Sequence, residues 1–213
     1  MSLSTVALAG FFATLNRAAG VEDSVLATAI AQRAEPGWES AIGYYLNTVL
    51  VRAKPAGDRS FRELLQEVHA FSLGLLEHMN YPLDLLASAL KPPRGEGRSP
   101  WFDVVLNWLS SDAFPRSVRL FHGIGDTLAP DGALPLEPLP VRRHLAKFDL
   151  EISMAEVSGE VVGHVQYKPS YLEEQTVTEL LALYRTVLFD SIAHPDLALD
   201  DIASGGRSEE TDQ

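Results

Sequence analysis

The stretch Ala41–Arg52, AIGYYLNTVLVR, alternates as a β-strand does, with one polar residue out of place. Period-two alternation puts Asn47 on the same side as Tyr45, Val49 and Val51, so an amide lies on the more apolar face. A buried Asn that lacks hydrogen bonds costs about 1–3 kcal/mol. Two explanations stay open: backbone groups satisfy Asn47, or this face lines a space in which a ligand binds.

The composition describes an ordinary globular chain and narrows its functions. Among 213 residues, 46% are hydrophobic and the formal net charge is −12, which disfavours nucleic acid and anionic membrane surfaces as partners. No apolar run approaches the length of about 18 residues that a membrane span needs. There is no cysteine, which excludes disulfides and thiolate zinc sites and is compatible with a reducing cytosol, so we predict a cytoplasmic protein.

Helix and strand signals extend in both directions from this strand. The apolar N-terminal segment predicts an amphipathic helix that ends at Gly20, and Ser60 with Glu63 predicts a capping box at the start of a second helix. We further predict a fully buried strand at 25–30, strands at 44–52 and 101–109, and a hairpin of 148–155 with 161–168. In the second helix an apolar stripe should face the core to about Met79, a short helix should follow Pro82, and a last helix should span 172–193. Residues 110–143 are expected to form a long excursion.

These elements indicate an α/β or α+β fold, a mixed β-sheet with helices on one face. We expect one domain over residues 1–202 and a disordered tail or linker at 203–213. Asn107 lies on the mixed face of the strand at 101–109, which is typical of a surface that lines a channel. Arg33 directly follows the buried strand, and it is either exposed at the strand end or fixed in an ion pair.

Motifs of common enzymes and metal sites do not occur in the sequence. It contains no Gly-x-Ser-x-Gly, P-loop or His-Glu-x-x-His pattern, and its six histidines lack ligand spacing, so we predict no metal site. The pair His122 and Asp126 has a His-x-x-x-Asp spacing, but it follows the wrong strand and we interpret it as a decoy.

Six segments, in order along the chain, resemble condensation domains of nonribosomal peptide synthetases. IGYYLNTVLVR is similar to the Ile-Gly-x-Phe-x-Asn-Thr motif of that family, through Gly43, Asn47 and Thr48. The other five are SVLATAIAQRAEPG, which ends near Arg33; HMNYPLDLL, with His78 and Pro82; RGEGRSPWFDVVLNW, with Arg98 and Pro100; AKFDLEISM, with Phe148 and Asp149; and YKPSYLEEQTVTEL.

The resemblance implies one of two chloramphenicol-acetyltransferase-like lobes. The family's His-His-x-x-x-Asp-Gly motif is missing and belongs to the N-terminal lobe, so the chain resembles the C-terminal lobe, with the excursion as its crossover or floor loop. By this resemblance Asn47, Tyr45 and Asn107 line a tunnel between the lobes, where they position substrates. Arg33 pairs with the aspartate of the catalytic motif in the other lobe. The chain itself is expected to carry no catalytic residue.

Two functions of different classes follow. In an intact domain, the lobe supports amide formation between a carrier-bound thioester donor and a carrier-bound amine, and is inactive alone. Alternatively it is a non-catalytic platform for neighbouring adenylation or carrier domains; an acyltransferase of the same superfamily is a third reading. Expected partners are the N-terminal lobe, carrier domains whose phosphopantetheine arms deliver substrates, and an adenylation domain, with no directly bound cofactor. We expect an exposed apolar patch where the other lobe packs, through which a homodimer can form.

Overall fold

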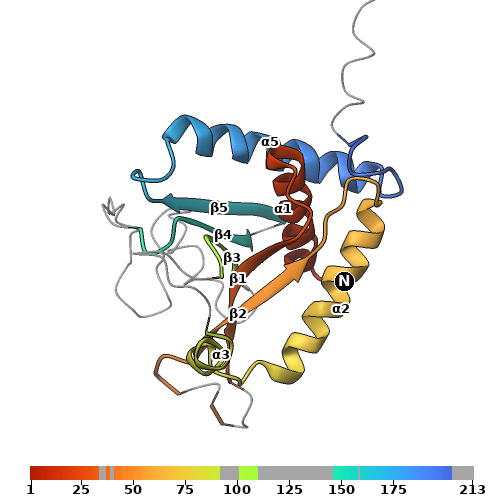
Figure 1. Cartoon of the computed structure of the whole chain (residues 1–213). Coiled ribbons are helices and arrows are strands. Elements are labelled where there is room, and N and C mark those ends of the chain that lie inside the picture. Colours follow the sequence, from red (N-terminus) through yellow and green to blue (C-terminus); the bar gives the residue numbers. More distant parts are fainter. Residues whose placement is uncertain (34–36, 39–40, 92–100, 110–145, 158, 203–213) are drawn as a thin grey trace, which may run out of the picture.

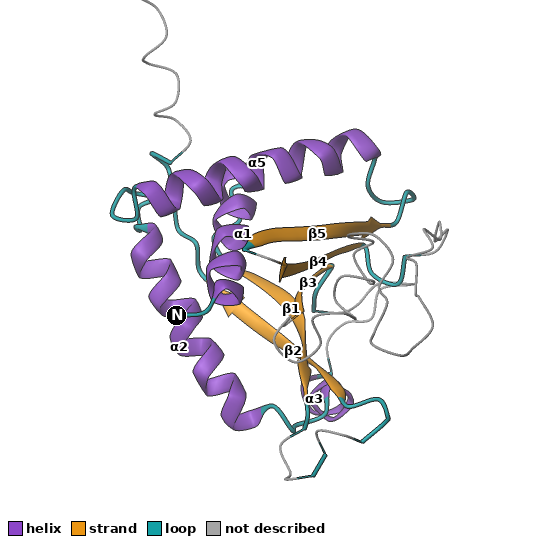
Figure 2. Ribbon diagram, turned by 180° about the vertical axis from the view of Figure 1, so that it is seen from behind, coloured by secondary structure: helices purple, strands orange, loops and turns teal. Residues whose placement is uncertain are grey.

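The computed structural model describes residues 1–33, 37–38, 41–91, 101–109, 146–157 and 159–202, and these contain one mixed five-stranded sheet (Figures 1 and 2). The strand order is β2-β1-β3-β4-β5. The central strands β1, β3 and β4 run parallel, and each outer strand is antiparallel to its neighbour. The strands are β1 (Ser24–Ala31), β2 (Leu46–Ala53), β3 (Val104–Leu109), β4 (Leu150–Val157) and β5 (Glu160–Tyr167).

Three long helices cover one face of this sheet, as predicted. They are α1 (Leu3–Ala19), α2 (Phe61–His78) and α5 (Glu174–Ala193), and the short helix α3 (Leu83–Leu90) lies beside β2 (Figure 1). Within the described residues, no helix is long and apolar enough to cross a membrane. The fold is thus the predicted mixed sheet with helices packed on one side.

Local signals place the helix ends where the sequence predicts them. Gly20 adopts the left-handed conformation with φ of 62°, and its N–H donates to the Asn16 carbonyl, which ends α1. At the start of α2 the Ser60 hydroxyl accepts from the Glu63 N–H, and the Glu63 carboxylate accepts from the Ser60 N–H at 2.9 Å. The predicted capping box is therefore confirmed.

The main core lies between the sheet and the three long helices. Phe11 and Tyr184 join α1 to α5, with their rings edge to face at 5.3 Å and the Tyr184 hydroxyl donating to the Ala7 carbonyl at 3.0 Å. Burial raises the pKa of the Tyr184 phenol above its usual range. The sheet contributes apolar side chains from four strands to this cluster: Leu26, Val51, Leu106, Leu150, Ile152 and Met154.

Two predictions about burial are wrong. The strand at 25–30 was expected to be fully buried, but in β1 only Leu26 and Ala27 are buried, because the covering helices leave its C-terminal end open. The apolar stripe of α2 is buried only at Phe61, Leu64 and Val68, and Phe71 is 38% exposed. Figure 1 shows the reason, since the C-terminal half of α2 extends past α1.

The hairpin is confirmed, with β4 and β5 antiparallel and Val157 opposite Glu160. The strand predicted at 101–109 begins only at Val104, and the strand predicted at 44–52 begins at Leu46. The excursion at 110–143, the tail at 203–213, Arg98 and Pro100 lie outside the described residues, as do His122 and Asp126.

Candidate functional site

The predicted tunnel residues Asn47 and Asn107 lie on opposite faces of the sheet. Asn47 points to the same face of β2 as Val49 and Val51, and Val51 belongs to the core under the helices. Asn107 points to the same face of β3 as Val105. Val105 packs with Ala27 in a small cluster on the face of the sheet opposite the helices. The two amides therefore do not form one cluster, although both lie near the same end of the sheet.

The Asn47 amide binds backbone groups. Its Nδ2 donates to the carbonyl oxygens of Met79 at 2.8 Å and Tyr81 at 2.9 Å. The Gln32 Nε2 also donates to the Met79 carbonyl, at 2.9 Å. These bonds tie β1 and β2 to the connection between α2 and α3, so backbone partners account for a polar group on this face. The role of Asn47 beside a tunnel stays a prediction.

Asn107 bridges a place where two neighbouring strands separate. β1 and β3 share a single residue pair, Ala27 with Val105. Beyond it, the Asn107 Oδ1 accepts from the Ala29 N–H at 3.0 Å, and its Nδ2 donates to the Glu151 carboxylate at 3.1 Å. A side-chain amide thus replaces the missing ladder bond. We call this place, residues 28–30 of β1 beside 107–109 of β3, the β1–β3 seam.

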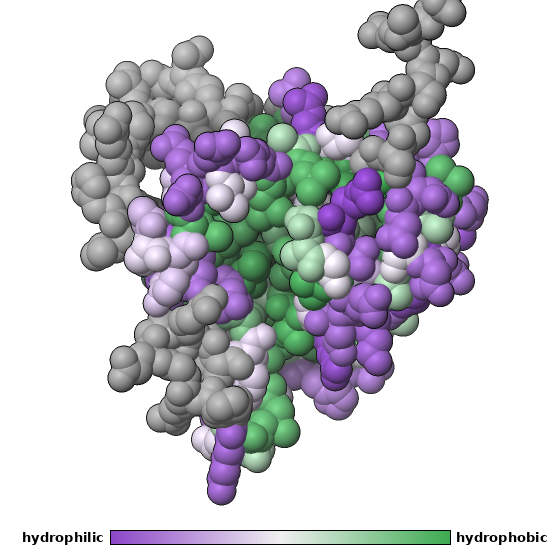
Figure 3. Space-filling view, turned by 45° about the horizontal axis from the view of Figure 1, so that its top comes forward, coloured by the Kyte–Doolittle hydropathy of each residue, from purple (hydrophilic) through white to green (hydrophobic). Residues whose placement is uncertain are grey.

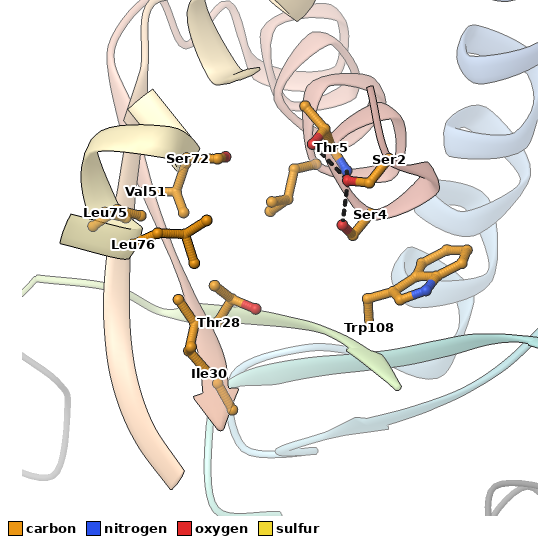
Figure 4. Close-up of a pocket in the computed structure, with 12 residues that line it drawn as sticks. Ser2, Ser4, Thr5, Thr28, Ile30, Val51, Ser72, Leu75, Leu76 and Trp108 are labelled. Carbon is orange, nitrogen blue, oxygen red and sulfur yellow. Dashed lines mark hydrogen bonds between the residues drawn. The ribbon is translucent and has the colours of Figure 1, made fainter. Parts of the chain in front are cut away.

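A pocket of about 250 Å³ lies over this seam on the helix-covered face (Figure 4). We call it the helix-face pocket. The start of α1, the second half of α2 and the strands β1, β2 and β3 contribute its walls. Twelve of the described residues line it: Ser2, Ser4, Thr5, Leu8, Thr28, Ala29, Ile30, Val51, Ser72, Leu75, Leu76 and Trp108. Sequence reasoning missed the pocket, because five separate segments supply these residues and none of them forms a motif.

Arg33 holds the loop that precedes β2. Its Nη1 donates to the carbonyl oxygens of Trp38 and of Ala41, the latter at 2.8 Å. The guanidinium lies over the Tyr45 ring, 4.5 Å from its centroid, and Tyr45 also contacts the Trp38 ring at 5.7 Å. The predicted ion pair of Arg33 with another lobe is not tested by these contacts. They fix the guanidinium near the end of β1.

A close contact with Tyr45 explains why a glycine occupies position 43 in the same loop. A Cβ atom at this position would lie 2.9 Å from Cε2 of Tyr45, closer than side chains normally approach. The ring of Tyr45 therefore occupies the space that a side chain at 43 would need.

The remaining described motif residues have structural contacts. His78 ends α2 and its carbonyl accepts from the Tyr81 N–H at 2.9 Å, and Pro82 precedes α3. Thr48 is half-buried in β2. Phe148 lies 5.8 Å from the Phe102 ring, and the buried Asp149 forms an ion pair with Lys168 at 3.0 Å. In the part of the chain that the structure describes, no group of three His, Asp or Glu side chains is arranged to hold a metal ion.

Large apolar side chains are exposed near the seam end of β1 and β2. Ile42 is fully exposed and Tyr44 is 81% exposed. Leu76 near the end of α2, Tyr81 in the connection to α3 and Leu85 in α3 are each about half exposed. Figure 3 shows apolar side chains gathered in a hollow in the middle of one face, between polar margins. Exposed apolar side chains are therefore present on the described part of the chain, and the predicted packing of another lobe or a second copy against them stays a prediction.

Comparison with known proteins gives the family. A profile of the condensation domain matches residues 1–212. The chain belongs to the condensation-domain family. Tyrocidine synthase 3 of Brevibacillus parabrevis is 28% identical over 201 residues, which cover 94% of this chain and 3% of that protein. Isonitrile lipopeptide synthase of Mycobacterium tuberculosis is 30% identical over 203 residues, 92% of this chain and 8% of that protein.

Solved structures share the fold. A four-domain nonribosomal peptide synthetase, crystallised with AMP and glycine, superposes with a TM-score of 0.86 at 24% identity, over 94% of this chain and 15% of that chain. The X-domain from teicoplanin biosynthesis gives a TM-score of 0.79 at 20% identity, over 95% of this chain and 44% of that chain. This condensation-family chain therefore spans less than a tenth of the curated relatives named above and under half of an isolated domain of the same fold.

Proposed function

We propose that the chain forms the C-terminal lobe of a condensation domain and supports amide bond formation in nonribosomal peptide synthesis. The observation that carries this proposal is the partial coverage: 95% of this chain aligns with only 44% of an X-domain chain. The six segments from Ser24 to the start of α5 resemble motifs of the family's C-terminal lobe, which supports the proposal, and the His-His-x-x-x-Asp-Gly pattern does not occur in the sequence.

In the proposed reaction a carrier-bound amine attacks the carbonyl carbon of a carrier-bound thioester. The nitrogen–carbon bond forms, the carbon–sulfur bond breaks, and the departing thiol sulfur takes up the proton that the amine nitrogen loses. The histidine that assists this attack would come from the N-terminal lobe. Phosphopantetheine arms of two carrier domains deliver both substrates and are not resident cofactors of this chain. Its contribution is positional, which can lower a barrier by several kcal/mol only when the reacting groups are present.

The exposed apolar side chains near Ile42 and Tyr44 favour contact with a second lobe. In this proposal Arg33, fixed at the end of β1, is available to the aspartate of the catalytic motif. Asn47 and Tyr45 contribute to the tunnel near the same end of the sheet as Asn107, which reaches it from the face opposite Asn47. The neighbouring adenylation domain and the carriers are further proposed partners. A homodimer through the same surface would compete with the second lobe.

A reconstitution experiment tests the proposal. The full chain is mixed with an N-terminal condensation lobe that carries His-His-x-x-x-Asp-Gly and with two loaded carrier proteins, and the carrier-bound peptide is measured by mass spectrometry. We expect product only when both lobes are present, and none when the second histidine of that motif is replaced by alanine. A complex of the two lobes that binds both carriers but forms no peptide would instead favour the alternative of an interaction platform.

A further inference from the structure

We propose that the helix-face pocket is a binding site for a neutral, mainly aliphatic group that carries one hydrogen-bonding end. This site lies on the face of the sheet opposite Asn107, and the argument for it does not depend on the proposed amide-forming role. It rests on the volume, the lining chemistry and the position of the pocket over the β1–β3 seam.

The volume is sufficient for a small organic group. An apolar cavity of about 150 Å³ inside a protein holds one benzene molecule, and the helix-face pocket measures about 250 Å³. Leu8, Ile30, Val51, Leu75 and Leu76 supply aliphatic walls, and the indole of Trp108 closes one side (Figure 4). A chain of several methylene groups would bury apolar surface against these walls, which is the main source of affinity in such sites.

The lining selects against a charged ligand. None of the twelve described residues that line the pocket carries a charge, so an ammonium or carboxylate placed here would lose water without gaining an ionic partner among them. Five of the described lining residues carry hydroxyl groups, and four of these hydroxyls already have partners. Those of Ser4 and Thr5 each bond the Ser2 hydroxyl, and that of Ser72 donates to the Val68 carbonyl.

Thr28 is the exception among these hydroxyls. Within the described residues its hydroxyl makes no hydrogen bond, and in Figure 4 it points toward the side of the pocket on which Trp108 lies. A ligand hydroxyl or amide can therefore bond to Thr28 without breaking a bond to any described residue. This gives the pocket one polar anchor among apolar walls, the usual arrangement of small-molecule sites.

The β1–β3 seam forms the floor of the helix-face pocket and favours ligand binding there. Because β1 and β3 share only the pair Ala27 and Val105, the strand ladder does not fill the floor of the pocket. The Asn107 side chain closes the floor from the opposite face through its bond to the Ala29 N–H. Asn107 is thus a positioning residue for the pocket: it holds β1 at a fixed spacing from Trp108 on β3.

The test uses the full chain and three probes with the same six-carbon tail: 1-hexanol, hexylammonium and hexanoate. Binding is followed by methyl NMR, where the Ile30 methyl reports the pocket and the Ile192 methyl, 53% exposed on α5, reports the outer surface. We expect hexanol to shift Ile30 and not Ile192, with a dissociation constant at least about ten-fold lower than that of hexylammonium. Hexylammonium is a stricter comparison with hexanol than hexanoate is, because the net charge of −12 attracts the cation to the protein, so weaker binding of the cation must come from the pocket itself.

Two serines provide a matched pair of variants. Ser72→Phe fills the pocket from α2, whereas Ser88→Phe makes the same change on the exposed face of α3; both hydroxyls donate only to a carbonyl of their own helix, one turn earlier. We expect hexanol binding to be lost in Ser72→Phe and retained in Ser88→Phe. Thr28→Val keeps the shape and the strand propensity, and should weaken hexanol binding about two- to ten-fold through loss of one hydrogen bond.

Several results would overturn the proposal. Absence of a saturable Ile30 shift with hexanol, equal or tighter binding of hexylammonium, or retention of hexanol binding by a folded Ser72→Phe would each do so. Circular dichroism of Ser72→Phe establishes that it is folded. Since these measurements need no second lobe and no carrier, their failure is distinct from failure of the reconstitution experiment.

Discussion

The two halves of α2 lie in different surroundings, and the difference divides the molecule into two regions. The first half packs Phe61, Leu64 and Val68 into the core between the sheet, α1 and α5, a region we call the packed region. The second half leaves Leu76 about half exposed at the helix-face pocket; we call this pocket and the β1–β3 seam together the open corner. The periodic apolar pattern continues through both halves.

The comparison separates apolar side chains that stabilise the fold from apolar side chains that are available to a partner or ligand. In the packed region apolar burial supplies the stability. In and beside the open corner, three side-chain amides hold backbone segments together. Asn107 does so where the β1–β3 ladder stops, and Gln32 and Asn47 do so at the connection between α2 and α3. Stability and binding capacity are thus located at opposite ends of one helix.

The largest predicted effect compares two phenylalanines. Phe11→Ala, in the packed region where the side chain is fully buried, should lower the free energy of unfolding by about 3–5 kcal/mol. Phe71→Ala, at the edge of the open corner with the side chain 38% exposed, should lower it by only about 1 kcal/mol. Urea unfolding followed by circular dichroism measures both. Equal losses would show that the open corner is packed as firmly as the core, and would end the comparison.

The next effect lies within the open corner. Asn107→Ala removes the acceptor of the Ala29 N–H and the donor to Glu151, so unfolding should become easier by about 1–3 kcal/mol. Asn47→Ala should cost less, about 0.5–1.5 kcal/mol, because the Met79 carbonyl keeps its bond to Gln32.

Amide hydrogen exchange gives this pair a local readout. We expect the Ala29 amide to exchange faster in Asn107→Ala and at its original rate in Asn47→Ala, since only Asn107 binds it. If Ala29 stayed protected in a folded Asn107→Ala protein, a strand ladder rather than the side chain would close the seam.

The contrast between the two regions also explains what the sequence could predict. Hydrophobic periodicity and the Ser60–Glu63 cap depend on neighbours along the chain, so the helices, the strands and the hairpin were predicted, although β2 and β3 begin at Leu46 and Val104, later than expected. The exposure of the second half of α2 depends on where α1 begins in space, and the seam depends on which strand pairs with β1. Those are contacts between distant segments, which a local pattern does not contain.

The same distinction applies to Asn47 and Asn107. The alternation identified Asn47 as an amide on an apolar face, and the structure supplies its partners, the carbonyls of Met79 and Tyr81. The sequence placed Asn107 on the same face as Val105, and the structure agrees, whereas its place in a channel stays a prediction. The bond to Ala29 follows from the strand order. The helix-face pocket had no sequence signal, because its lining residues come from five separate segments, and the serines and threonines among them lie on only three of these.

A third prediction concerns the buried hydroxyl of the packed region. Tyr184→Phe loses the bond to the Ala7 carbonyl and should cost about 1 kcal/mol near pH 7. Burial raises the folded-state pKa of Tyr184 above the ordinary value of about 10, so above pH 10 the unfolded chain ionises first. The stability that the buried phenol contributes is therefore present below pH 10 and is lost as the pH rises further.

The stability gap between wild type and Tyr184→Phe should accordingly narrow between pH 10 and 11. Urea titrations at pH 7, 10 and 11 measure it, with Tyr171→Phe, half exposed beyond the end of β5, as the control. A gap that stays constant over this range would mean that the phenol is less well buried than its contact with Ala7 indicates.

The smallest effect is at the cap that begins α2 in the packed region. The N–H and then the hydroxyl of Ser60 donate to the Glu63 carboxylate and lower its pKa below the ordinary value, so ionised Glu63 stabilises the fold at neutral pH. With a lowered folded-state pKa, this contribution is present above about pH 4.3 and is lost as the pH falls through the folded value.

Glu63→Gln keeps an acceptor without the charge, so it should be slightly less stable than wild type at pH 7, and the difference in the free energy of unfolding should disappear by pH 3. Glu77→Gln, an exposed change on the second half of the same helix, serves as the control. A wider gap at pH 3 than at pH 7 would contradict this sign and would mean that the carboxylate at the N-terminus of α2 destabilises the folded chain.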